Sequence, residues 1–323
     1  PLLSLMVDLF VNNNMKTKKL ISIVLPCFNE EKNVAYSYKL TCEVLKKITQ
    51  YQYEFIYVDN GSTDDTRGEI TKLHAKDRRV KGIFLSRNFG PESSVWAGMV
   101  HCKGIAVITI ECDMQSPPSL IPKFIRKFEE GFNIVVGIYN RSEDDPIITF
   151  LRKTFYSIFK RISNIDIPIN ATGVGLMDRK SLDSLKLLPE KFRLYRGLRA
   201  WVGFKTAHIS YERIGRVHGN SSYNFLDYIK HAERGLFGFS YLLLDLMAYF
   251  GFILVILSFL FIICYAAISL LFGNPIKGSI TILISIIFFG GIQVLAISTI
   301  GKYVQVIVEE VKNRPTYIID KII

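Results

Sequence analysis

Two long uncharged segments near the carboxyl-terminal end constrain the fold of this chain more than any other feature. No charged residue occurs from Leu246 to Phe272 or from Ser279 to Ile300. A helix of about 20 apolar residues is long enough to cross a bilayer core of about 30 Å. Residues 273–278 join the two segments as a short polar turn. The sequence therefore predicts a transmembrane helical hairpin over residues 240–301, with two core helices of a soluble protein as the alternative.

Basic residues on both sides of this hairpin indicate its orientation. The flanking basic residues are Lys230, Arg234, Lys302, Lys312 and Arg314. Only Lys277 lies in the turn. Because positive charge favours the cytoplasmic side, we expect a multi-pass protein of the inner (cell) membrane with a cytoplasmic domain and a cytoplasmic tail over 302–323. The net charge of +11 suits an anionic membrane surface, and no basic–aromatic stripe or helix-turn-helix spacing indicates nucleic acid.

The amino-terminal residues and the cysteines bear on the compartment. Residues 1–19 are apolar but interrupted by Asp8, and no basic segment precedes the apolar run, so we expect an extension rather than a signal peptide. Met15, which several lysines follow, resembles a natural start. The cysteines are odd in number and are predicted to be reduced core thiols, not disulfides or metal ligands. They are Cys27, Cys42, Cys102, Cys112 and Cys264.

Short β-branched runs alternate with amphipathic segments through the first part of the chain. Strands are predicted over residues 20–26, 53–58, 80–85, 105–110 and 134–137. This alternation predicts an α/β domain over residues 20–225, with a mostly parallel sheet and helices on both faces. Such sheets bind ligands at the carboxyl ends of their strands.

Two helices of this domain can be predicted in detail. Asn29 is expected to cap a helix that begins at Glu30 and Glu31, whose charge suits a helix amino terminus. A second helix is expected over 118–130, and Gly131 is expected to end it. Its predicted apolar face consists of Ile121, Phe124, Ile125 and Phe128.

Two later segments combine basic and apolar residues with helical spacing. Residues 226–239 lead directly into the first uncharged segment, and we predict an interfacial amphipathic helix there. For residues 150–162, an interfacial helix and a packed helix with a solvated basic face are equally supported.

Polar clusters follow four of the predicted strands, at residues 27–30, 59–62, 87–90 and 111–113. Their convergence at one edge of the sheet predicts a pocket. In the last cluster, Glu111 and Asp113 are one residue apart, and both can reach a hard cation such as Mg²⁺ or Mn²⁺. Such a site suits a reaction in which a nucleoside diphosphate departs. Capping of the following turn by the two acids is an equal alternative.

An ordered set of motifs covers nearly the whole chain from about Lys19. The motifs are VLPCFNEEKNV (24–34), VDNGSTDDT (58–66), LSRNFGPESSVWAGM (85–99), ECDMQSPP (111–118), LMDRK (176–180), LYRGLRAWVGF (194–204) and YERIGRVHGNSSY (211–223). With the terminal hairpin, this set resembles the family 2 glycosyltransferases of the GT-A fold, a Rossmann-like nucleotide-sugar-binding domain. More narrowly, it resembles the glycosyltransferases that act on polyprenyl phosphates such as bactoprenol and dolichol phosphate.

This resemblance implies roles for particular residues. The donor nucleotide would be bound by Pro26, Asn29, Glu30, Asp59, Asn60, Gly61, Ser62, Arg87 and Asn88. Glu111 and Asp113 would hold Mg²⁺ or Mn²⁺ on the donor diphosphate, and Asp113 and Gln115 would be the catalytic residues, with Gln115 near the sugar or the acceptor phosphate. Candidates for binding the acceptor phosphate are Arg141, Arg152, Arg196, Arg213 and Arg216.

A lipid phosphate is an anion at pH 7, so its attack needs positioning and cationic cover but no general base. A single displacement of this kind inverts the anomeric centre. The isolated histidines of this sequence agree with a mechanism without a catalytic triad.

The sequence departs from the family's pattern at several polar positions. The substituted residues are Glu111 for Asp, Asn60 for Asp, Tyr139 for Arg, Gly173 for Asp, Gly175 for Arg and Ser222 for Lys. The lost cations bear on lipid-phosphate binding, and Arg141 is a candidate replacement for the arginine missing at Tyr139. The lost acid at Gly173 removes a carboxylate that relatives have.

The sequence therefore predicts inverting transfer of a hexose from a nucleotide-diphosphate sugar, UDP-glucose or similar, to polyprenyl (undecaprenyl) phosphate at the cytoplasmic membrane face. A transferase to another membrane acceptor is one alternative, and a silent nucleotide-sugar-binding membrane paralogue is the other. Small residues in the second span also permit tight helix packing, either within one chain or between the chains of a homo-oligomer. They are Gly290, Gly291, Ala296 and Ser298.

Overall fold

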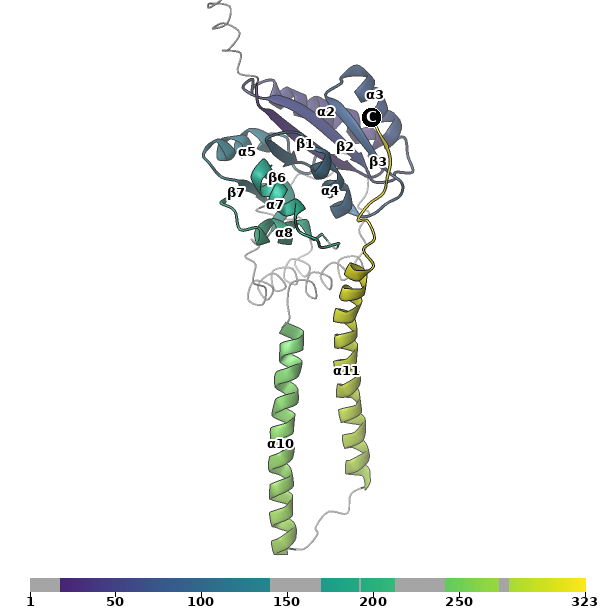
Figure 1. Ribbon diagram of the computed structural model, residues 1–323, viewed down its shortest axis with the longest axis vertical. Helices are drawn as coiled ribbons and strands as arrows, with labels where there is room; N and C mark the ends of the chain where they lie inside the picture. The colour runs from purple at the N-terminus through teal and green to yellow at the C-terminus, as the bar shows by residue number, and fades with distance from the viewer. Residues whose placement is uncertain (1–17, 140–169, 192, 213–241, 273–278) are drawn as a thin grey trace, which may run out of the picture. The chain divides into compact units, whose positions relative to one another are not determined.

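The computed structural model describes residues 18–139, 170–191, 193–212, 242–272 and 279–323 (Figure 1). The chain divides into an α/β unit, which includes residues 315–323, and a helical unit within residues 223–314. The predicted helices over 150–162 and 226–239 lie outside the described residues.

Within the described residues, the α/β unit has an eight-stranded sheet in the order β7-β5-β6-β4-β1-β2-β3-β8. The strands are β1 (Leu20–Cys27), β2 (Gln52–Asp59), β3 (Val80–Leu85), β4 (Ala106–Thr109), β5 (Ile134–Tyr139), β6 (Ala171–Asp178), β7 (Thr206–Tyr211) and β8 (Ile319–Ile322). β6 is antiparallel to β4 and β5, and β8 is antiparallel to β3, while the other neighbours are parallel. The mostly parallel sheet and its first five strands are confirmed.

Helices cover both faces of this sheet. They are α2 (Glu31–Leu45), α3 (Thr66–Lys76), α4 (Pro91–His101), α5 (Leu120–Glu129), α7 (Arg179–Lys186) and α8 (Tyr195–Trp201). Gly98 of α4 lies so close to Val24 and Val58 that an added Cβ would be 2.3 Å and 3.1 Å from their side chains. Leu25 and Tyr57, which follow Val24 and precede Val58 in their strands, point to the opposite face of the sheet, into the core beneath α2, α3 and α5.

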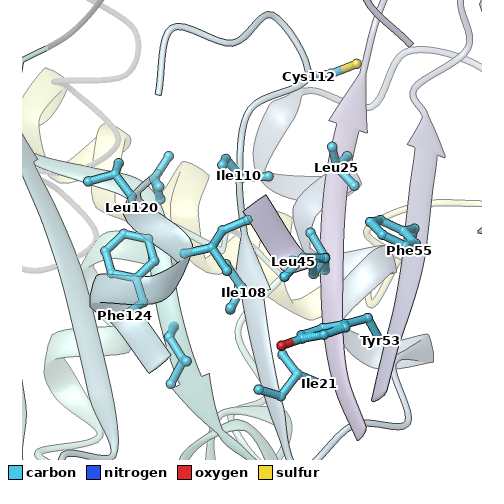
Figure 2. Packing of buried hydrophobic residues seen from close by; sticks show 14 of the residues in the cluster. Ile21, Leu25, Leu45, Tyr53, Phe55, Ile108, Ile110, Cys112, Leu120 and Phe124 are labelled. Atoms are coloured by element: carbon cyan, nitrogen blue, oxygen red, sulfur yellow. The ribbon is translucent and has the colours of Figure 1, made fainter. Parts of the chain in front are cut away.

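That core joins β1, β2 and β4 to the helices on their shared face. Figure 2 shows part of it, with Leu25 of β1, Phe55 of β2, Ile108 of β4 and Phe124 of α5. All four side chains are fully buried. Burial of one such side chain contributes about 1.5–3 kcal/mol, so this cluster holds the parallel strands in register.

The helix predicted over 118–130 is confirmed as α5. Ile121, Phe124 and Ile125 of its predicted apolar face are buried, and Phe128 packs against the core. The helix ends before Gly131, whose φ of +86° is the left-handed conformation that glycine adopts without strain.

The prediction that Asn29 caps α2 is wrong. Glu30 is the N-cap residue, and its own side chain makes no capping hydrogen bond to the helix backbone. Asn29 has a φ of +56°, and its side-chain oxygen accepts a hydrogen bond from the N–H of Thr63 at 2.8 Å. The Asn29 side chain thus binds the loop after β2, which is distant in the sequence, and not the first turn of α2.

The predicted tail over 302–323 does not form one segment. Helix α11 (Ser279–Val311) continues into it, and its last residues form β8 at the edge of the sheet. The Ile323 N–H donates to the Gly82 carbonyl at 2.9 Å, and the N–H of Gly82 returns the bond at 3.1 Å. β8 therefore pairs the edge of β3 that would otherwise present unpaired backbone groups.

The helical unit contains α10 (Leu242–Phe272) and α11. In the described residues, one helical stretch, Phe288–Val311, is long and apolar enough to cross a membrane, whereas the apolar stretch Tyr249–Tyr265 is shorter. Their large apolar side chains are largely exposed, as at Phe252 (66%) and Leu295 (67%). A spanning helix fits this exposure, and the first span of the hairpin, on α10, stays a prediction.

Candidate active site

The predicted polar clusters follow adjacent strands of the sheet. Cys27 at the end of β1 pairs with Asp59 at the end of β2, and Val24 pairs with Thr109 at the end of β4. Because these strands are parallel, the loops that follow them leave the sheet at the same edge. The structure thus brings the clusters at 27–30, 59–62 and 111–113 to one end of the sheet.

The loops after β1 and β2 bind each other directly. The Asn29 N–H donates to Ser62 Oγ at 2.9 Å, and the Asn29 side chain accepts from the N–H and hydroxyl of Thr63 at 2.8 and 3.2 Å. The Glu30 N–H donates to Thr66 Oγ1 at 2.8 Å. The predicted nucleotide-binding residues Asn29, Glu30 and Ser62 therefore hold the shape of these loops.

The two loops also cap each other's helices. The N–H of Glu31 donates to Asp64 Oδ2 at 3.1 Å, and the N–H of Asp65 donates to Glu31 Oε2 at 3.1 Å. Carboxylates near helix amino termini are favourable because they meet unsatisfied N–H groups and the positive end of the helix dipole. The amino termini of α2 and α3 are thereby held together.

Asp59 is completely buried at the end of β2. Its Oδ1 accepts from the Ser62 N–H at 3.1 Å, and its Oδ2 accepts from Arg67 Nε at 2.7 Å. Arg67 also donates to the Leu85 carbonyl, at the end of β3, and to Asp320 of β8 at 3.0 Å. A buried carboxylate requires such partners. Asp59, expected at the nucleotide, is the anchor of the β2 loop.

Asn60 joins the loop after β2 to the loop after β3. Its Nδ2 donates to Asn88 Oδ1 at 3.0 Å, and its Oδ1 accepts from the Phe89 N–H at 3.0 Å. A carboxylate has no N–H to donate, so an aspartate at residue 60 could not make the first bond. This contact is the physical reason why an amide suits residue 60.

Gly61 and Arg87 complete the contact between these loops. Gly61 has a φ of +72°, and an added Cβ would lie 2.4 Å from the backbone of Arg87, so no other residue fits there. Arg87 is exposed, and its guanidinium lies over the Phe89 ring at 4.1 Å from the centroid. Pro26, also predicted to bind the nucleotide, is half-buried near the end of β1.

Glu111 and Asp113 lie in the turn that follows β4. Glu111 Oε2 accepts from Ser116 Oγ at 2.9 Å, and Ser116 Oγ lies 2.9 Å from the Tyr211 hydroxyl of β7. Asp113 is 7% exposed, and its Oδ1 accepts from the Gln115 N–H at 3.1 Å. The capping alternative is thus realised in part for Asp113, and the predicted catalytic Gln115 lies beside it.

Cys112, between the two acids, is buried, and its sulfur lies 3.6 Å from Ser37 Oγ. Cys27 lies in the same core, where burial raises the pKa of its thiol well above the usual value. Both thiols are unpaired and Cys264 is exposed. The prediction of buried core thiols therefore holds for Cys27, Cys102 and Cys112, and is wrong for Cys264, which lies on an exposed helix.

The donor set at the β4 turn suits a hard cation. Two carboxylates one residue apart are oxygen ligands of the kind that Mg²⁺ and Mn²⁺ accept, with substrate phosphate oxygens as further ligands. Within the described residues, no group of three or more His, Cys, Asp or Glu side chains could enclose a metal ion alone. Glu111 and Asp113 therefore fit a metal that is shared with a substrate, and their role as its ligands stays a prediction.

Residues 22–186 match the model of the family described as glycosyl transferase family 2. The chain belongs to this family. A bactoprenol glucosyl transferase derived from a prophage of Shigella flexneri is 36% identical over 302 residues, which are 93% of this chain and 97% of that protein. An uncharacterised glycosyltransferase of Synechocystis is 35% identical over 93% of this chain and 94% of its own length. The predicted family and the prediction of a glycosyltransferase are confirmed.

A solved structure of glucosyl-3-phosphoglycerate synthase from Mycobacterium tuberculosis, in complex with Mn²⁺ and UDP, is a more distant match. It is 20% identical, with a TM-score of 0.47 over 68% of this chain and 77% of that one. A likeness this low carries no argument about the site of this glycosyltransferase.

Of the arginines predicted for the acceptor phosphate, the structure describes Arg196 of α8. Its Nη1 donates to the Ala171 carbonyl of β6 at 3.2 Å. Glu92 of α4 lies nearby, since its Oε2 accepts from the Tyr195 N–H at 3.3 Å. Burial raises the pKa of Glu92, while Arg196 and Arg199 act against that shift. The other candidates lie outside the described residues; they are Arg141, Arg152, Arg213 and Arg216. Ser222 also lies outside them.

Three charged residues of this glycosyltransferase escaped the sequence analysis: Arg67, Glu92 and Arg199. Arg67 and Glu92 lie inside the quoted motif regions or directly beside them, but nothing in their spacing indicated a buried partner. Arg199 is inside LYRGLRAWVGF, and its burial of 97% exceeds what an arginine on a short helix would suggest. The burial of Arg199 could therefore be seen only in the structure, where this arginine lies against β6.

Proposed function

We propose that this glycosyltransferase moves a hexose from a nucleotide-diphosphate sugar to the phosphate of a polyprenyl lipid. The observation that carries the proposal is the match to bactoprenol glucosyl transferases over nearly the full length of both proteins. The Shigella flexneri protein matches over 97% of its length, and an Escherichia coli prophage homologue is 33% identical over 99% of its length. Bactoprenol phosphate is undecaprenyl phosphate, so that lipid is the proposed acceptor.

The proposed donor is UDP-glucose or a similar nucleotide sugar. The interlocked loops after β1, β2 and β3 would receive the nucleotide, and Glu111 and Asp113 would hold Mg²⁺ or Mn²⁺ at its diphosphate. When bound, such an ion supplies positive charge that neutralises the diphosphate as it departs. The Ser116 hydroxyl, between Glu111 and Tyr211, would orient the first carboxylate.

The proposed reaction is a single displacement. A phosphate oxygen of the lipid attacks the anomeric carbon, a bond forms between them, and the bond from that carbon to the diphosphate oxygen breaks. The electron pair leaves with the nucleoside diphosphate, and the anomeric centre inverts. The attacking oxygen is already an anion, so no general base is needed. This agrees with Gly173, which carries no carboxylate where relatives have an acid.

The proposed location is the cytoplasmic face of the inner membrane. The apolar stretch Phe288–Val311 supports membrane association, and the basic residues that flank the predicted hairpin support the orientation. In this position the α/β unit would meet a soluble nucleotide sugar on one side and a lipid phosphate on the other.

The test is a transfer assay with the purified full chain in detergent. It combines radiolabelled UDP-glucose, undecaprenyl phosphate and either Mg²⁺, Mn²⁺ or a chelator, and measures label that extracts into organic solvent. We expect labelled lipid with a divalent ion and none with the chelator or with undecaprenol, which lacks the phosphate. A β-linked sugar in the lipid product, formed from an α-linked donor, would establish inversion.

Two outcomes would change the proposal. Label on another membrane acceptor, and none on the lipid phosphate, would favour the alternative transferase. No labelled lipid with any common nucleotide sugar, although the nucleotide still binds, would refute the proposed acceptor.

A further inference from the structure

Arg199 is a buried cation that α8 places against β6. It belongs to α8 and is 3% exposed. Its Nη2 donates to the Thr172 carbonyl of β6 at 2.7 Å, and its guanidinium lies 5.0 Å from the centroid of the Tyr195 ring. These two contacts hold the planar guanidinium in one orientation.

The second arm of this guanidinium has no hydrogen-bond partner among the described residues. Nη1 of Arg199 is buried and makes no hydrogen bond in the described part of the chain. A buried charged donor without a partner is costly, and such groups are rare in folded proteins. Burial also lowers the pKa of Arg199, because the cation is removed from water, and an anion beside Nη1 would oppose that shift.

Nη1 lies beside the position that a Cβ of residue 175 would take. An added Cβ at Gly175 would be 3.3 Å from Nη1 of Arg199 and 2.2 Å from the Val135 carbonyl oxygen. The arginine of the family's Asp-Phe-Arg-Leu pattern falls on residue 175, where this backbone has no room for it. Arg199 therefore brings a guanidinium from α8 into the space next to a strand position that has lost one.

The strand register links the position beside this guanidinium to the segment that carries the acid pair. Gly175 pairs with Thr109, and Thr109 is two residues before Glu111. The Thr109 hydroxyl donates to the Gly173 carbonyl at 2.7 Å. Gly173 is half-buried, and an added Cβ there would meet no atom of the described residues within 4 Å. Open space therefore adjoins β6 at Gly173, two residues from Gly175. Gly173 lies toward the end of β4 that is followed by the two acids.

We infer that Arg199 binds a phosphoryl oxygen of a substrate through Nη1, in the space beside Gly173 of β6. The inference rests on the proposed function, which supplies two such groups, the donor diphosphate and the lipid phosphate. Guanidinium N–H groups suit phosphate oxygens in geometry and charge. Because Thr172 already holds the other arm, little side-chain entropy is lost on binding.

The test compares two variants of Arg199 with a matched control in the full-chain transfer assay. Arg199→Met removes the charge and both arms, and Arg199→Lys keeps a charge but loses the planar fork. The control is Arg179→Met, since Arg179 also donates to backbone carbonyls, of Gly104 and Cys102, but near the amino end of β4. KM for UDP-glucose, KM for undecaprenyl phosphate, kcat and the thermal unfolding midpoint are measured for each.

We expect Arg199→Met to raise one KM by about 10- to 100-fold, the range for a lost hydrogen bond to a charged group. Arg199→Lys should recover part of the loss, and Arg179→Met should leave both KM values within twofold. An increase in the KM for UDP-glucose would place the donor diphosphate at Arg199. An increase in the KM for undecaprenyl phosphate would place the lipid phosphate there.

Several results would overturn the inference without touching the proposed function. One is a wild type that makes labelled lipid and an Arg199→Met variant with both KM values and kcat unchanged. Another is a lower unfolding midpoint with unchanged KM values, which is the result of a purely structural role. If Arg199→Met does not fold, Arg199→Lys decides, since wild-type KM values in that variant would exclude a phosphate-binding fork. An inactive wild type would instead refute the proposed function.

Discussion

Two sides of the candidate site differ in how they use their polar groups. The interlocked loops, residues 29–31, 59–67 and 87–90, direct many of their side-chain oxygens and amides toward each other. The β6–α8 side, residues 171–175 and 195–199, has two glycines on one strand and a buried arginine with an arm that binds nothing in the described residues. The polar groups of the interlocked loops bind mainly each other, whereas Nη1 of Arg199 on the β6–α8 side can still bind a ligand.

This difference shows why similar residue types can have different duties in one site. Asp59 is an acid at a strand end, and Arg67 and the Ser62 N–H bind both of its oxygens. A side chain saturated by the protein contributes shape, whereas one with remaining capacity can contribute binding energy. Substitutions on the two sides should therefore separate stability from activity.

The largest expected effect lies at the acid pair, next to the β6–α8 side. Asp113→Asn should lower kcat/KM by about 100-fold or more, because charge stabilisation by a bound metal is worth several kcal/mol. The carboxylate-to-amide change keeps the shape, so the unfolding midpoint should stay within a few degrees of the wild type. The transfer assay with titrated Mn²⁺ measures the activity, and thermal unfolding measures the stability. Wild-type turnover in this variant would show that the metal role is assigned wrongly.

The next effect is expected on the interlocked loops and should appear as lost stability. Arg67→Met leaves Asp59 as a buried carboxylate without its ion pair, which should cost roughly 2–4 kcal/mol of unfolding free energy. Urea unfolding followed by the fluorescence of the buried Trp96 measures it. Asp320→Ala is the matched control, because that carboxylate is 55% exposed and its pair with Arg67 should contribute less than about 1 kcal/mol. Equal losses in both variants would contradict the role of Asp59 as an anchor.

A smaller effect is expected where the loop after β2 meets the loop after β3. Asn60→Asp removes the donor to Asn88 Oδ1 and places two acceptor oxygens together, which should cost about 1–3 kcal/mol. In a double-mutant cycle with Asn88→Ala, the two losses should be less than additive, since both variants remove the same bond. Additive losses in urea unfolding would mean that the 3.0 Å contact contributes nothing.

The smallest effect concerns the pH dependence of the β6–α8 side. The pKa of Glu92 is raised above its ordinary value of 4.5, chiefly by burial, so the folded protein binds this proton more tightly than the unfolded chain does. The stability that Glu92 contributes is therefore complete below pH 4.5 and declines as the pH rises through the raised pKa. Relative to Glu92→Gln, the urea midpoint of the wild type should fall with rising pH in that window. A difference that is constant with pH would contradict the shift.

Much of the fold was accessible from local patterns. The β-branched runs predicted the first five strands, and the apolar spacing at Ile121, Phe124 and Ile125 predicted α5 and its buried face. The pair Glu111 and Asp113 was accessible for the same reason, because the strand before it directs both residues to the carboxyl edge of the sheet. These features depend on residues that are only a few positions apart, so the spacing of apolar residues in the sequence is enough to predict them.

Other features depend on partners far along the chain. The Asn29 side chain binds Thr63 and not its own helix, and Asn60 acts through Asn88. β8 could not be predicted, since its four residues do not alternate between apolar and polar and form a strand only when the edge of β3 is beside them.

By itself, the sequence determined the α/β class, the family, the strand-end acids and the long apolar segments, because each is a property of residue type and local spacing. Only the tertiary structure decided which polar groups are saturated. It placed Arg67 on the buried Asp59 and the guanidinium of Arg199 beside Gly175. The physical reason is that a buried hydrogen bond or ion pair depends on distances of about 3 Å between residues that only folding brings together.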